Sequence, residues 1–98
     1  MAVHACALSV ELHLPAATSL KAKRAAVRPL LETARARFRV AAAEVGFQDQ
    51  WQRALLGFAA VGGEAGQVAE VLDKLERFVW SHPDVEVLTV SRTWLEES

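Results

Sequence analysis

Cysteine is almost absent from this 98-residue sequence, in which Cys6 is the only one. A single thiol cannot form a disulfide within the chain, so nothing in the sequence points to an oxidising compartment. Long apolar runs are absent as well. Residues 1–14 lack a basic leading segment and are interrupted by polar side chains such as Glu11 and His13, so we expect neither a signal peptide nor a membrane span there. The expected location is the cytoplasm.

The motifs of common metal and catalytic sites are also lacking. Of the three histidines, His4 and His13 fall on opposite faces of one expected strand, and His82 follows the end of an expected helix. None of them has a closely spaced second ligand, so we predict no metal site. The sequence shows no motif around a serine or cysteine nucleophile and no phosphate-binding glycine loop. We predict no catalytic residues and no cofactor, which favours a non-enzymatic protein.

Acidic residues are scarce in one part of the chain. Seven of the eleven basic residues lie between Lys21 and Arg39, where Glu32 is the single acidic residue. The net charge of −1 hides this asymmetry: residues 1–53 carry eight basic and four acidic side chains, and residues 54–98 carry three and eight. The halves therefore differ in sign, at +4 and −5. Such a layout favours either a polyanionic partner or self-association.

The apolar periodicity predicts six elements in a single domain, residues 1–98. Apolar residues are 52% of the chain and charged residues 23%, a composition typical of a folded globular protein. Spacing of two predicts strands, and spacing of three to four predicts helices. The expected order is strand 2–14, helix 19–38, strand 40–45, strand 52–61, helix 68–79 and strand 85–95. This order predicts an α+β ferredoxin-like sandwich, in which two helices cover one face of a four-stranded antiparallel sheet.

The first expected helix has two stripes of side chains. The apolar stripe is Leu20, Val27, Leu31, Ala34 and Phe38. We call the basic stripe beside it the basic ridge, and we predict that it binds nucleic-acid phosphates through Lys21, Arg24, Arg28, Arg35 and Arg39. The alternative is a solvated helix face whose long side chains cover the edge of the core. We expect Lys23 and Arg37 to lie on the other flank, where they only aid solubility.

Pro29 lies inside this helical pattern, after a start at Thr18 or Ser19. A proline inside a helix removes one backbone donor and crowds the preceding turn. We therefore expect a kink near Pro29 or a helix in two pieces.

The second face of the expected sheet carries small and apolar side chains. In the first strand these are Val3, Ala5, Ala7 and Ser9, and in the third strand Leu55, Gly57, Ala59 and Val61. An apolar face of this kind on a small monomer favours a partner chain. We predict a homodimer through this open sheet face.

A second group of candidate residues surrounds the loop between the second and third expected strands: His13, Glu44, Asp49, Trp51 and Arg53. Glu44 and Asp49 are suitable as an acid and base pair if a cleft holds them. The simpler interpretation is that Asp49 caps the loop and that Glu44 pairs with Arg53 or His13. For Trp51, stacking on a ligand and filling the hairpin end are both open, and filling is favoured.

Several segments together resemble the bacterial YlxP-like family of unknown function: Glu11-Leu12-His13-Leu14-Pro15, Ser19-Leu20-Lys21, Lys23-Arg24, Ala43-Glu44-Val45-Gly46, Gln48-Asp49 and Trp51-Gln52-Arg53-Ala54. The resemblance spans nearly the whole chain and implies a small cytosolic protein of ferredoxin-like fold. It also implies an association with transcription and ribosome-maturation proteins. The chain departs from the family pattern at Ala22, where Glu is usual, at Phe47, where His is more frequent, and at Pro29.

Two functional hypotheses follow from these features. The first is a non-enzymatic protein that binds RNA or a ribosomal particle through the basic ridge. The second is a homodimeric protein-interaction or small-ligand-binding module that uses the open sheet face and the segment from Glu44 to Trp51.

Overall fold

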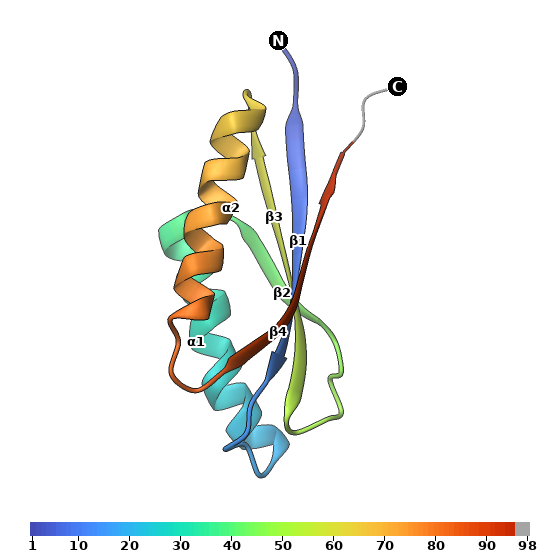
Figure 1. Cartoon of the computed structure of the whole chain (residues 1–98), viewed down its shortest axis with the longest axis vertical. Helices are drawn as coiled ribbons and strands as arrows, with labels where there is room; N and C mark the ends of the chain where they lie inside the picture. The colour runs from blue at the N-terminus through green and yellow to red at the C-terminus, as the bar shows by residue number, and fades with distance from the viewer. Residues whose placement is uncertain (96–98) are drawn as a thin grey trace.

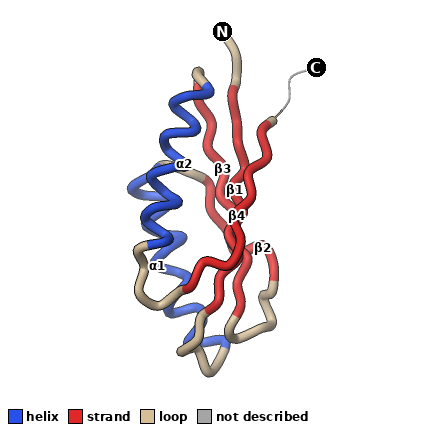
Figure 2. Tube along the Cα trace, in the orientation of Figure 1, coloured by secondary structure: helices blue, strands red, loops and turns tan. Residues whose placement is uncertain are grey.

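The computed structural model describes residues 1–95 and contains the six predicted elements in the predicted order. They are β1 (His4–His13), α1 (Leu20–Phe38), β2 (Ala41–Gly46), β3 (Arg53–Gly62), α2 (Ala65–Trp80) and β4 (Glu86–Trp94). The strands form one antiparallel sheet in the order β2-β3-β1-β4. Both helices lie on the same side of this sheet, and its other side is uncovered (Figures 1 and 2). The predicted α+β ferredoxin-like fold is confirmed.

The core forms between the helices and the two central strands, β1 and β3. Because side chains alternate along a strand, β1 directs every second residue to the helices. Leu8 and Val10 are fully buried there, opposite Phe58 and Leu56 of β3. Burying side chains of this size stabilises a fold by about 1.5–3 kcal/mol each. The alternation read from the sequence therefore corresponds to the division between core face and open face.

The helices cover this core with one side each. In α2 the buried residues recur at helical spacing and are Val68, Leu72, Leu75 and Val79. The opposite side of α2 is exposed and includes Glu70 and Asp73. Within the described residues, no helix combines the length and the apolar character needed to cross a membrane.

The first helix is continuous through Pro29, so the predicted division into two pieces is wrong. Ser19 begins the helix, and its hydroxyl accepts a hydrogen bond from the Ala22 amide at 3.0 Å. Pro29 itself is exposed, while Val27 and Leu30 on either side of it are buried against the sheet. This packing holds the helix together across the missing amide donor.

The last strand does not alternate strictly between the two faces of the sheet. The register between β1 and β4 shifts by one residue, so that Thr89 pairs with Glu11 and Val87 pairs with Leu12. Val87 and Val90 therefore both pack against the core. The extra residue of this bulge is Leu88, which is 50% exposed.

Beyond the bulge, Arg92 links β4 to α2. Its Nη2 donates to Asp73 Oδ1 at 2.8 Å and to Glu76 Oε1 at 3.3 Å. Burial lowers the pKa of the guanidinium, but the hydrogen bonds and charges of the two carboxylates outweigh it, so the pKa is raised above its ordinary value. Arg92 is therefore occupied by carboxylates of its own chain.

We predict that Pro29→Ala stabilises the protein. Alanine restores the amide that donates to the carbonyl of residue 25 and removes the ring from an exposed position. The unfolded chain gains some freedom in return, so we expect the free energy of unfolding to rise by about 1–2 kcal/mol. Equilibrium urea denaturation measures this change. An unchanged or lower stability would show that α1 is adapted to the proline.

Candidate functional site

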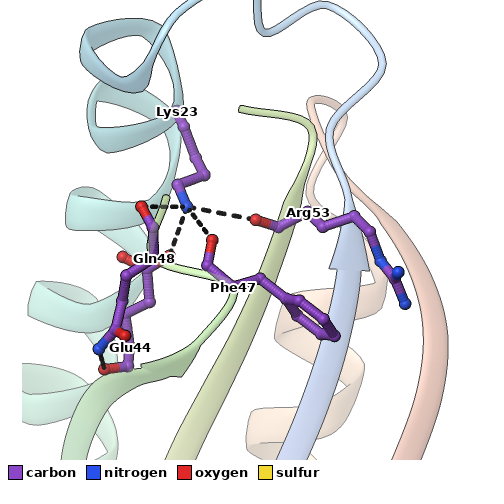
Figure 3. A network of polar contacts seen from close by, with 5 residues as sticks. All are labelled: Lys23, Glu44, Phe47, Gln48 and Arg53. Atoms are coloured by element: carbon purple, nitrogen blue, oxygen red, sulfur yellow. Dashed lines mark hydrogen bonds and ion pairs between the residues drawn. The ribbon is translucent and has the colours of Figure 1, made fainter. Parts of the chain in front are cut away.

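The most buried charged residue in the described chain is Lys23, whose side chain is 1% exposed. It extends from the first turns of α1 into the segment that joins β2 to β3 (Figure 3). Its Nζ donates to three backbone carbonyls: Phe47 at 2.8 Å, Gln48 at 3.2 Å and Arg53 at 3.3 Å. The same atom lies 2.9 Å from Glu44 Oε2. One amine therefore fastens the helix to both ends of the hairpin loop.

The position of Lys23 corrects the prediction that it lies on a solvated flank. The buried residues of α1 are Lys23, Val27, Leu30, Leu31 and Ala34. Residues four, seven, eight and eleven positions after Lys23 thus share its face, which is the spacing of one helix side. The same phase leaves Leu20 only partly buried. The spacing of the apolar residues therefore indicated that Lys23 is buried, but its charge favoured the prediction of an exposed side chain.

The partner of Glu44 also differs from the prediction. Glu44 pairs with Lys23, whereas Arg53 Nη2 pairs with Glu11 Oε2 at 2.7 Å and His13 Nδ1 lies 3.1 Å from Glu86 Oε2. The three protons of Lys23 Nζ have three carbonyl acceptors, so Glu44 Oε2 gains an ion pair without a well-aligned hydrogen bond. The Glu44 side chain is 20% exposed, and water reaches part of it.

Phe47 shapes the loop that receives the lysine. Its backbone is left-handed, with φ of 56°, a conformation that costs a non-glycine residue about 1 kcal/mol. The Phe47 carbonyl accepts hydrogen bonds from Lys23 Nζ and from the Gln50 amide. The guanidinium carbon of Arg53 lies 4.2 Å from the centre of the Phe47 ring. These contacts hold the strained backbone in place.

The remaining loop candidates lie at the surface. Asp49 is exposed at the tip of the loop. Among residues 1–95, its side chain forms no hydrogen bond with Glu44 and none that caps the loop. Trp51 is 54% exposed, so the prediction that it fills the hairpin end is wrong. Of the five candidates, the structure brings Glu44 and Arg53 to the contacts around Lys23. His13 lies next to Arg53 in the β1–β3 register.

The basic ridge is exposed along α1. Arg24 and Arg28 lie between two hollows in the surface and line both of them. Lys21 and Glu32 join them around a hollow of about 450 Å³, and Arg35 and Glu44 around one of about 260 Å³. Among residues 1–95, no carboxylate lies within 4.0 Å of a ridge cation.

The two last members of the ridge are placed differently. Arg35 Nη2 donates to the Ala42 carbonyl of the edge strand β2 at 2.6 Å. Arg39 follows the last turn of α1 in the left-handed conformation, with φ of 56°. The structure therefore gathers Lys21, Arg24, Arg28 and Arg35 on one flank and leaves Arg39 at the end of the helix.

The open sheet face has the small side chains that the sequence predicts. A shallow hollow of about 440 Å³ crosses its centre and is lined by residues of all four strands, including Ala7, Ser9, Gly57, Ala59 and Ser91. None of the residues that line it is charged. The ion pairs Glu11–Arg53 and His13–Glu86 lie together at one end of β1.

The sequence matches a protein family and a bacterial protein over most of its length. Residues 5–92 match the family described as protein of unknown function DUF503. The chain is 39% identical over 77 residues to the uncharacterized protein YlxP of Bacillus subtilis strain 168. The match covers 79% of this chain and 83% of that protein. It therefore spans most of both sequences.

We predict that Lys23→Met lowers the free energy of unfolding by about 3 kcal/mol or more, because it leaves Glu44 and the loop carbonyls without their partner. Lys21→Met is the matched control, two residues away on the exposed side of the same helix, and we expect a change within about 0.5 kcal/mol. Urea denaturation of both variants measures the difference. Equal losses would contradict the anchoring role of Lys23.

Proposed function

We propose that this chain, which belongs to the DUF503 family of proteins of unknown function, is a non-enzymatic cytoplasmic protein that binds RNA or a ribosomal particle through the basic ridge of α1. The observation that carries the proposal is the exposure of Lys21, Arg24 and Arg28 without a carboxylate partner among residues 1–95. Cations in this state lose little when they exchange water and counterions for phosphates.

The arrangement of the ridge supports contact with a phosphate backbone. Lys21, Arg24 and Arg28 follow one side of a continuous helix at spacings of three and four residues, and each turn adds about 5.4 Å along the axis. Arginine adds paired donors that suit phosphate oxygens. A row of this kind binds the backbone of a nucleic acid without reading its bases. The choice of RNA among polyanions follows the transcription and ribosome context that the family resemblance implies.

Lys23 supports the same proposal by contrast. It is the ridge's neighbour in sequence, and its charge is used inside the protein to fix α1 on the hairpin loop. The exposed cations are therefore presented by a helix whose position is fixed before any partner binds. Preorganisation of this kind reduces the entropy lost on binding.

A second proposal concerns assembly: two copies pair through the open sheet face. Four strands about 4.8 Å apart, with β1 ten residues long, give this face roughly 600 Å². A standard interface buries about 800 Å² per partner, so the face has nearly the needed size. The hollow at its centre has no charged lining residue, which suits an identical face and offers no cation to a nucleic acid. In such a dimer both ridges stay on the outside, because the helices lie on the other side of each sheet (Figure 1).

For the ridge, we predict a steep salt dependence of RNA binding. Five phosphate contacts, one for each cation of the basic ridge, give a slope of about −3.5 for the logarithm of the affinity for single-stranded RNA against the logarithm of the salt concentration. Reversing Lys21, Arg24 and Arg28 to Glu reduces this slope to about −1.4. Fluorescence anisotropy across a series of salt concentrations measures both slopes. The charge-conserving triple variant K21R, R24K, R28K is the control and keeps the steep slope. A wild-type protein that binds no RNA at low salt would refute the proposal.

For the dimer, we predict that Ala59→Glu gives a monomer, since it places a charge at the centre of the buried face. Ala65→Glu, on the exposed start of α2, is the control and leaves the dimer intact. Sedimentation equilibrium separates the two states, because the monomer is 10.7 kDa. A wild-type protein that is monomeric at high concentration would contradict this proposal.

A further inference from the structure

A separate hollow of about 620 Å³ is lined by residues from the C-terminal parts of α1 and α2. The two helices lie side by side on the same face of the sheet (Figures 1 and 2). Its lining includes Arg37 and Phe38 of α1 and Lys74, Arg77 and Phe78 of α2. We call it the helix-end hollow. Its size is within the range of sites that hold small molecules, and no residue of the basic ridge lines it.

Two aromatic rings form one wall of this hollow. The centres of the Phe38 and Phe78 rings are 5.6 Å apart, and both side chains are only partly buried. The guanidinium carbon of Arg37 lies 5.2 Å from the first ring centre and 5.9 Å from the second. Arg37 was expected to do no more than aid solubility, but it lies against these rings. A guanidinium held in this way provides a flat cationic surface on which a planar group can stack.

Cations surround the rings. Among residues 1–95, Arg37 and Arg77 have no carboxylate within 4.0 Å, while Lys74 pairs with Glu70 at 3.1 Å. Both arginines lie in the last turns of their helices, where a positive charge offsets the helix dipole. The dipole accounts for the charges, but it does not account for the partly exposed pair of rings between them. Aromatic surface together with free cations is the combination that binds single-stranded nucleic acids.

We propose that the helix-end hollow binds one unpaired nucleotide of an RNA strand whose other phosphates lie on the basic ridge. The base stacks on Arg37 and the edges of Phe38 and Phe78, and Arg77 contacts the phosphate of the same nucleotide. Arg28 and Arg37 are nine residues apart, about 14 Å along the helix and half a turn around it. A strand that joins the two sites therefore crosses the exposed side of α1, which takes a few nucleotides. This inference rests on the proposed function and makes single-stranded RNA, not a duplex, the preferred form.

The test compares binding of a fluorescein-labelled oligouridine with binding of a blunt RNA duplex of the same length. Phe78→Leu keeps an apolar side chain at the core edge, and we expect it to weaken oligouridine binding at least about fivefold. Its affinity for the duplex stays unchanged, because paired bases are not available for stacking. Trp80→Leu is the matched control: it removes an exposed aromatic ring from the same helix, outside the hollow, and leaves both affinities unchanged.

Arg77→Gln gives a second measurement that does not disturb the core. We expect it to weaken oligouridine binding and to reduce the salt slope by about 0.7, the contribution of one phosphate contact. Thermal unfolding of each variant shows whether it is folded. If Phe78→Leu is not folded, the oligouridine affinities of Arg77→Gln and Arg37→Gln test the proposal instead.

The outcomes separate the two proposals. Wild-type oligouridine affinity in the hollow variants, or equal losses for oligouridine and duplex, would overturn the helix-end hollow as a nucleotide site. If the ridge reversal still weakens binding in that case, the proposed function stands without this inference. If the wild-type protein binds neither oligouridine nor duplex, both are overturned.

Discussion

The buried amine of Lys23 fixes α1 over the β2–β3 loop. A charged amine is costly to remove from water, and Lys23 retains its place because a carboxylate and three carbonyls replace that water. A buried ion pair adds little net stability compared with an apolar pair of the same size. What it adds is position, because Nζ joins α1 to Phe47, Arg53 and Glu44 of the hairpin at once. The direction of the exposed ridge follows from that position.

The arginines form two groups, those paired with carboxylates of this chain and those without such a partner among residues 1–95. Arg53 and Arg92 are paired with carboxylates that fix strands and helices to one another. Arg24, Arg28, Arg37 and Arg77 are not paired in this way among residues 1–95, and they lie on the helical layer. The uncovered side of the sheet has instead a central hollow without charged lining residues. The two sides of the molecule thus suit different partners, an anionic strand on the helices and an apolar surface on the sheet.

Sequence patterns predicted the architecture well because the core obeys simple periods. The alternation in β1 and the spacing in α2 assign the buried residues of these two elements. The errors occur where one residue breaks a period or where residue type and position disagree. The bulge at Leu88 reverses the faces of β4, and no local pattern marks it. Lys23 has the spacing of a core residue and the charge of a surface residue. It is buried because a loop distant in the sequence supplies hydrogen-bond acceptors for its amine, and the local sequence does not show this. The pairing of Arg53 with Glu11 depends likewise on strand register, which sequence spacing does not give.

We propose that the helical layer, and not the open sheet face, binds RNA. Amide chemical shifts of the ¹⁵N-labelled protein, followed during titration with a short oligouridine at low salt, test this claim residue by residue. We predict shifts along the exposed side of α1 and around Phe78, with the amide shifts of Ala7, Gly57 and Ala59 unchanged. Shifts concentrated on the open sheet face, or no shifts at saturating oligouridine, would contradict it.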